Sequence, residues 1–125
     1  MHKRLYNFLG HNNILYQSQY GFREKHSTTE AILEFISDTV ESMENKKSTI
    51  GVFLDLSKAF DTINHNILLQ KLDYYGIRGI AKTWFKDYLS NRKQYVNYEN
   101  HNSQQMNLIC GVPQGSILGP LLFLI

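Results

Sequence analysis

The first strong pattern of hydrophobic positions predicts a helix in the first third of the chain. Its start is indicated by Ser27-Thr28-Thr29-Glu30, a capping-box sequence in which the hydroxyl binds a free helix N–H and the glutamate binds back to the cap. Its buried face is predicted from apolar residues that recur every three or four positions. These residues are Ile32, Phe35, Ile36, Val40 and Met43.

A second pattern predicts a strand over residues 48–56. Val52, Phe53 and Leu54 are consecutive apolar residues, which is typical of a strand that is buried on both faces. Such a strand holds the carboxylate of Asp55 near its carboxyl end. From this position alone, an aspartate is more often a turn residue than a metal ligand.

Three further helices are expected in the first ninety residues. They are predicted over residues 3–9, 64–75 and 80–89. The first two are expected to end at Gly10 and Gly76, because glycine tolerates the left-handed backbone conformation that commonly ends a helix.

A hairpin and a last helix are expected near the end of the chain. The hairpin strands are predicted over residues 93–98 and 104–110, with the polar residues 99–102 as the turn. Ser116 is expected to cap the last helix, and Pro120 is compatible with that helix because it lies in the first turn.

The composition of the chain indicates one folded domain or part of a larger one. Its 125 residues are 42% hydrophobic and include 7 Phe, 8 Tyr and 1 Trp, and disordered chains are poor in aromatic residues. Trp84 is expected in the core, at helical spacing from Ile80. The single cysteine, Cys110, fits a reducing, intracellular compartment, with nucleus and cytoplasm both open. Residues 117–125 are too few to span a bilayer, which needs about 20, so no membrane contact is expected.

Two segments resemble motifs A and B of the reverse transcriptases of non-LTR (LINE-like) retrotransposons. The first runs from Phe53 to Asn64 and reads FLDLSKAFDTIN, and the second runs from Gly111 to Ser116 and reads GVPQGS. Residues 19–28, which read QYGFREKHST, extend the similarity over nearly the whole chain. The sequence is therefore identified as a member of this family.

The resemblance implies an α+β fold that is part of a right-hand polymerase, namely the palm with part of the fingers, incomplete at both ends. Residues 1–47 are expected to be fingers-like, and residues 48–68 to be palm with motif A. Residues 69–112 are expected to form helices and a hairpin on the fingers side, and residues 113–125 to hold motif B and the start of a palm helix. The thumb, the aspartate-pair hairpin and an endonuclease are the missing remainder. Without that hairpin, the strand ending at Asp55 has an uncovered edge, which predicts poor solubility.

The implied function is RNA-directed DNA polymerisation by two-metal nucleotidyl transfer. Its partners are an RNA template, a DNA primer and dNTPs, and its cofactor is Mg²⁺, with Mn²⁺ as the alternative. Asp55 is implied as the catalytic metal ligand, joined by the backbone carbonyl of Leu56. Because the remaining catalytic carboxylates belong to a motif that this sequence lacks, the chain alone is expected not to polymerise. A catalytically dead nucleic-acid-binding module and a non-functional relic remain as alternatives.

The resemblance also implies four nucleotide-binding residues. Phe60 matches the aromatic steric gate that excludes a 2′-hydroxyl, whereas the sequence alone would place it in the core. Pro113, Gln114 and Gly115 match the loop that faces the incoming nucleotide and the template, whereas these residues alone suggest an ordinary tight turn. Asp61 is expected to cap the following helix rather than to bind metal.

Basic residues provide two candidate nucleic-acid contacts, although the net charge of +2 does not by itself indicate a nucleic-acid binder. Arg23 and Lys25 lie in a segment that approaches template or nucleotide in the family, and a solvated loop charge is an equally weighted alternative for Arg23. Arg78, Lys82 and Lys86 are spaced by four and share one helix face that could follow phosphates. A solvated helix face is the more common origin of such a stripe.

Overall fold

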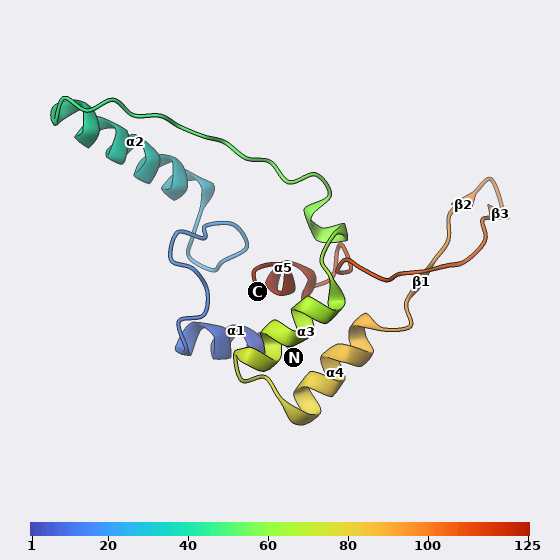
Figure 1. The fold of residues 1–125 in the computed structure, drawn as a ribbon. Coiled ribbons are helices and arrows are strands. Elements are labelled where there is room, and N and C mark those ends of the chain that lie inside the picture. Colours follow the sequence, from blue (N-terminus) through green and yellow to red (C-terminus); the bar gives the residue numbers. More distant parts are fainter.

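The computed structural model describes residues 1–125 and contains five α-helices, one short 3-10 helix and four two-residue strands (Figure 1). This mixture of helices and small antiparallel sheets is an α+β architecture, as the sequence predicts. The helices are α1 (His2–His11), α2 (Thr28–Glu44), η1 (Ala59–Asp61), α3 (His65–Tyr74), α4 (Gly79–Leu89) and α5 (Gly119–Phe123). The strands are β1 (Lys93–Gln94), β2 (Asn97–Tyr98), β3 (His101–Asn102) and β4 (Met106–Asn107).

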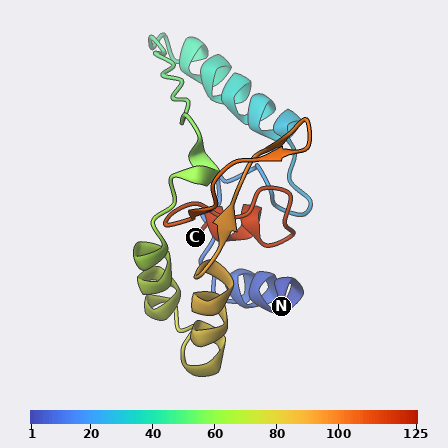
Figure 2. The same cartoon turned by 90° about the vertical axis from the view of Figure 1, so that its right-hand side faces the viewer.

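The hydrophobic core lies where α1, α3, α4 and α5 meet (Figures 1 and 2). Helices α1, α3 and α4 each contribute two buried side chains four residues apart, which places both on one face of the helix. Burial of one such side chain stabilises the fold by about 1.5–3 kcal/mol. The pairs are Leu5 and Leu9 in α1, Leu68 and Leu72 in α3, and Phe85 and Leu89 in α4, and α5 adds Leu121 and Leu122.

The helices α3 and α4 pack against each other and confirm both helices predicted in this region. The side-chain oxygen of Asn64 accepts hydrogen bonds from the backbone N–H groups of Asn66 at 2.9 Å and Ile67 at 3.2 Å, which caps α3. Gly76 follows the helix with φ of 95°, so the predicted stop is confirmed.

The first helix, α1, is longer than predicted. Gly10 lies inside it, and the helix continues to His11. The end is formed instead by two asparagines. The Asn12 side-chain amide donates to the Phe8 carbonyl at 2.8 Å, and Asn13 adopts a left-handed φ of 51°, which asparagine tolerates better than most residues. The prediction that Gly10 stops this helix is therefore wrong.

The helix α2 begins at the predicted capping box. Ser27 Oγ accepts from the Glu30 N–H at 3.2 Å, and the Ser27 N–H donates to Glu30 Oε2 at 2.9 Å. However, α2 contains no buried residue, and its predicted core face is exposed. Figures 1 and 2 show α2 extending away from the core, so only local sequence signals, and no core packing, define this helix.

The strand predicted over residues 48–56 is absent. The segment is extended without regular secondary structure and links α2 to η1 (Figure 1). Ile50 and Leu54 are 88% and 89% exposed. A strand needs a neighbour that binds its backbone N–H and C=O groups, and no segment of this chain pairs with it. The prediction of a buried strand is therefore wrong for this structure.

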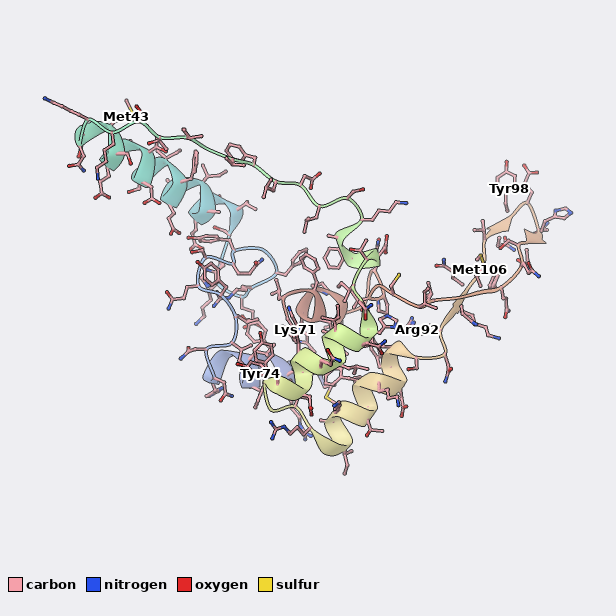
Figure 3. The ribbon with its side chains drawn as sticks, viewed as in Figure 1. Met43, Lys71, Tyr74, Arg92, Tyr98 and Met106 are labelled. Carbon is pink, nitrogen blue, oxygen red and sulfur yellow. The ribbon has the colours of Figure 1, made fainter.

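A hairpin forms where it was predicted, but its bounds differ. The predicted strand 93–98 is divided into β1 and β2, and the predicted turn 99–102 contains strand β3. β1 pairs with β4 and β2 pairs with β3, both antiparallel. The turn itself consists of Glu99 and Asn100, which have positive φ values of 46° and 64°, the pattern of a two-residue hairpin loop. The hairpin extends away from the helices, and Figure 3 labels Tyr98 and Met106 along it.

Of two aromatic neighbours in α4, Phe85 is buried and Trp84 is partly exposed. Phe85 is 1% exposed and belongs to the core, whereas Trp84 is 38% exposed and stacks on Tyr88 with ring centroids 5.4 Å apart. Trp84 was predicted as a core residue from its spacing to Ile80, but Ile80 is itself 91% exposed. The prediction for Trp84 is therefore wrong, because the buried face of α4 is the one that carries Phe85.

The last helix, α5, follows the motif B loop. Ser116 Oγ accepts from the Gly119 N–H at 2.9 Å and donates to the Pro113 carbonyl at 2.7 Å. The N-cap of α5 is Leu118 and not Ser116, so the predicted cap position is wrong, although the Ser116 hydroxyl does bind the N–H of the first helical residue. Pro120 lies in the first turn, as predicted. No helix of the chain has both the length and the apolar character needed to cross a bilayer.

Candidate functional site

The end of the motif A segment and the motif B loop are joined through their backbones. The Gly111 N–H donates to the Ile63 carbonyl at 2.8 Å, and the Val112 N–H donates to the Phe60 carbonyl at 2.9 Å. The ring nitrogen Nε2 of His65 lies 2.7 Å from the Gly111 carbonyl oxygen. These bonds bring together two segments that lie about fifty residues apart in the sequence, and they form the motif junction.

Gly111 makes this junction possible. It has φ of 84°, and a Cβ atom at this position would lie 2.9 Å from the Cα atom of Asp61 and 3.0 Å from its carbonyl oxygen. Only glycine satisfies both the left-handed backbone and the close approach. The residue type that opens motif B is thus required by its contact with motif A.

A side-chain hydrogen bond reinforces the junction. Gln114 Nε2 donates to Asp61 Oδ1 at 2.8 Å. The prediction that Asp61 caps the following helix is wrong, because Asn64 fills that role. Asp61 instead holds the side chain of the central motif B residue.

A hollow of about 580 Å³ opens beside this junction. Its wall includes Asp61, the two cations Lys58 and Arg92, Gln94 and residues 107–114. The hollow therefore combines one carboxylate, two positive charges and several amide groups. Such a combination suits an anionic ligand that also carries hydrogen-bonding groups.

Phe60 lies between two other aromatic rings. Its ring centroid is 5.5 Å from that of Phe22 in an edge-on arrangement and 4.7 Å from that of Phe123. It is half-buried and packs against the hydrophobic core. Phe60 does not line the hollow, so here it has the core role that the sequence alone suggests.

Only some residues of the motif B loop line the hollow. Pro113 and Gln114 line it, whereas Gly115 does not. Gly115 has φ of 77°, and the Ser116 N–H donates to the Pro113 carbonyl at 3.2 Å, so Gly115 lies in a tight turn. The structure thus brings Gln114 together with Asp61, and Gly115 serves the turn that leads into α5.

Asp55 and Leu56 lie apart from this hollow. Both are exposed on the extended segment, and neither belongs to the wall. No group of three or more His, Cys, Asp or Glu side chains gathers in the chain. Because Mg²⁺ requires several oxygen ligands in octahedral geometry, the residues present do not by themselves make a divalent-metal site.

Arg23 binds the loop that precedes it. Its Nη1 donates to the Tyr16 carbonyl at 2.8 Å and to the Gln17 carbonyl at 3.3 Å, and its Nε is buried without a partner. Arg23 is therefore not a freely solvated loop charge in this structure. Lys25 is exposed and has a left-handed φ of 63°.

The basic stripe of α4 is partly neutralised. Lys82 Nζ lies 3.3 Å from Asp73 Oδ2, and Arg78 Nε lies 3.9 Å from Asp73 Oδ1. Lys86 has no ion-pair partner. The two cations at the hollow, Lys58 and Arg92, were not singled out from the sequence. Lys58 is part of motif A, but Arg92 carries no sequence signal except its place before the hairpin.

Comparison with known proteins assigns the chain to a family. All residues, 1–125, match the family model described as "Reverse transcriptase (RNA-dependent DNA polymerase)". The chain is 34% identical over 96% of its length to "Probable RNA-directed DNA polymerase from transposon BS" of Drosophila melanogaster. It is 36% identical over 84% of its length to "RNA-directed DNA polymerase from mobile element jockey" of the same species. No solved structure matches significantly.

The chain belongs to the reverse transcriptase family. Its relatives, which also include the polymerase of the Drosophila X-element at 31% identity, confirm the resemblance to non-LTR elements. The chain spans 13%, 11% and 13% of the lengths of the transposon BS, jockey and X-element proteins. Its sequence therefore corresponds to a small part of proteins of this kind.

Proposed function

We propose that the chain is a segment of the RNA-directed DNA polymerase of a non-LTR retrotransposon. This segment holds motif A against motif B and binds the incoming nucleotide. The observation that carries this proposal is the Asp61–Gln114 hydrogen bond beside a hollow with two cations. The substrates are an RNA template, a DNA primer and dNTPs. In this proposal the chain contributes palm and fingers parts, and the thumb, the aspartate-pair hairpin and an endonuclease belong to other parts of the polymerase.

The chemistry of the hollow supports a nucleotide ligand. Lys58 and Arg92 can neutralise phosphate oxygens, and arginine can bind two of them at once. An ionised carboxylate only accepts hydrogen bonds, so the amide nitrogen of Gln114 must face Asp61. The amide oxygen of Gln114 is then directed away from Asp61 as an acceptor for a donor group of the ligand.

We further propose roles for the motif A residues that lie outside the hollow. Asp55 and the Leu56 carbonyl are the protein's oxygen ligands for Mg²⁺, and the other ligands come from parts of the polymerase outside this chain. When bound, the metal ions would activate the primer hydroxyl and neutralise the leaving group. Phe60 limits the space at the sugar, supported by its fixed position between Phe22 and Phe123. The chain alone is expected not to polymerise.

Primer extension on RNA, with a polymerase that contains this segment, tests the proposal. Asp55→Asn should abolish dNTP incorporation, and Phe60→Ala should admit rNTPs. Asp61→Ala should raise the KM for dNTPs about tenfold with kcat largely kept, because loss of a hydrogen bond to a charged group costs about 1.5–3 kcal/mol. Asp38→Asn, on the exposed surface of α2, removes the same charge and should change nothing.

Three results would count against the proposal. Full incorporation by the Asp55→Asn enzyme would remove Asp55 from catalysis. An unchanged KM in the Asp61→Ala enzyme would show that the junction does not position the nucleotide. Complete inactivity of the unaltered polymerase, with RNA binding retained, would favour a non-catalytic binding module.

A further inference from the structure

A second hollow, of about 420 Å³, lies between α3, the end of α4 and the base of the hairpin. Three cations, Lys86, Arg92 and Lys93, line it, and no Asp or Glu does. The wall also includes three asparagines, Asn66, Asn91 and Asn107. It therefore presents positive charge and hydrogen-bond donors without an acidic group that would repel an anion.

The three cations of this hollow have no ion-pair partner. The ion pairs of the chain involve Asp73 or Glu30, and none of the three cations takes part in them. Unpaired cations that line one hollow repel one another and favour an anionic ligand. This arrangement differs from the stripe on α4, whose members Arg78 and Lys82 lie close to Asp73.

The three cations lie within eight residues of the chain, and the turn from α4 into β1 brings them to one hollow. Lys86 belongs to the last turn of α4, Arg92 to the loop that follows, and Lys93 to β1. Arg92 lies at the junction between α4 and the hairpin (Figure 3). Its guanidinium carbon is 5.5 Å from the centroid of the Tyr88 ring, a cation–π contact that helps to fix its position.

The second hollow adjoins the hollow beside the motif junction. The two share Arg92, Asn107, Leu108 and Ile109 in their walls. An anionic ligand that reaches both hollows must therefore carry repeated negative charges. A nucleic-acid strand has this property, because its phosphates repeat along the chain, whereas a single nucleotide would fill only one hollow.

We propose that the second hollow, which is lined by Lys86, Arg92 and Lys93, binds the phosphate backbone of a polynucleotide strand. This strand would lie beside the first hollow, which binds the incoming nucleotide. The proposal rests on the proposed function, since a polymerase must hold a strand next to the incoming nucleotide. Phosphate contacts of this kind position a strand without reading its sequence. The hollow also explains how a chain with a net charge of only +2 can hold nucleic acid locally.

Fluorescence anisotropy with a labelled, unstructured oligouridylate tests the proposal. The 125-residue chain, tethered to a carrier protein that keeps it soluble, is compared with a Lys86→Gln/Lys93→Gln variant. Both lysines are exposed, so their replacement leaves the core intact. The matched control is Lys46→Gln/Lys47→Gln, which removes the same charge just beyond the end of α2.

The expected result is a change in salt dependence as well as in affinity. Each lost phosphate contact to a single strand should reduce the slope of log K against log salt by about 0.7, so the double variant should lose about 1.4. If the affinities converge at about 1 M salt, this corresponds to about 25-fold weaker binding at about 0.1 M. The control variant should keep the slope of the unaltered chain.

Three outcomes would overturn the proposal. Equal losses in the two double variants would show that only net charge matters. A poly-glutamate peptide that binds as tightly as the oligonucleotide, with the same loss in the Lys86→Gln/Lys93→Gln variant, would assign the hollow to acidic peptides. A free nucleoside triphosphate that shows the same lysine dependence, with no gain for an oligonucleotide, would make the hollow part of the nucleotide pocket.

Failure of this test is distinguishable from failure of the proposed function. The Asp55→Asn substitution should abolish incorporation without altering the salt slope, because Asp55 is outside both hollows. Conversely, if the lysine variants bind RNA normally while a polymerase that contains the segment still extends primers, only the placement of the strand is wrong.

Discussion

At the scale of single residues, the contact between Asp61 and Gly111 is the tightest constraint in the candidate site. The backbone of Asp61 occupies the space that a side chain at Gly111 would need. The glycine also has a positive φ, which other residues adopt at a cost of about 1–3 kcal/mol. Both effects act on the one junction that holds motif A against motif B.

Gly111→Ala is therefore expected to destabilise the fold by about 2 kcal/mol or more, since strain and steric overlap add. Gly10→Ala is the matched control. Gly10 lies within α1, and a Cβ there meets no atom within 4 Å. The control should stabilise the chain by up to about 1 kcal/mol, because alanine favours the helix. Denaturant melts of both variants measure the difference, and equal stabilities would contradict the assigned role of Gly111.

Residue types identified the motifs, but they did not identify every contact. The sequence indicated Gln114 through its family motif, yet the partner of Gln114 could not be derived, because a bond across fifty residues leaves no local pattern. Asp61 illustrates the same difficulty. Its position before a helix suggested a cap, and Asn64, three residues later, competes for that role and takes it. Arg23 likewise binds backbone carbonyls that no residue pattern indicates.

At the scale of elements, local signals predicted the helices better than the strand. Capping boxes and glycine stops act within a few residues, so the start of α2 and the end of α3 were predicted close to their observed positions. Burial of residues 48–56 depends on a partner segment, and the sequence of a strand does not contain its partner. The hairpin was predicted because both of its strands and its turn are adjacent in the sequence.

The helix α2 tests whether local sequence signals alone can define a helix. Because α2 buries no residue, its stability should depend mainly on its cap. Ser27→Ala should destabilise α2 by about 1 kcal/mol and accelerate amide hydrogen exchange within it. Exchange in α3 and α4 should not change. Thr29→Ala is the control, since Thr29 makes no capping hydrogen bond, and equal effects on α2 and α3 would contradict this account.

At the scale of the whole molecule, a small core coexists with a large exposed apolar surface. Only 14 of 125 residues are buried. Exposed apolar side chains continue from α2, whose far end is marked by Met43 in Figure 3, into the extended segment. Contiguous apolar surface of this kind promotes association.

The isolated chain is accordingly expected to self-associate. Val52→Lys/Leu54→Lys places two charges on the exposed segment and should shift the chain toward monomer in sedimentation velocity experiments. The melting temperature should stay the same, because neither side chain belongs to the core. Arg92 and the second hollow are untouched by this change. A monodisperse monomer of the unaltered chain at micromolar concentration would contradict the expectation.

The hairpin has a consequence for the evolution of the family. Its two ends are held together by the pairing of Lys93 with Asn107 and by the bond from the Leu108 N–H to the Arg92 carbonyl at 2.8 Å. Its tip, Glu99 and Asn100, extends into solvent away from the helices (Figure 1). Doubling the length of such a loop costs only about 0.6 kcal/mol. Natural insertions and deletions between the two motifs should therefore accumulate at this tip, where they leave the positions of Arg92 and Gly111 unchanged.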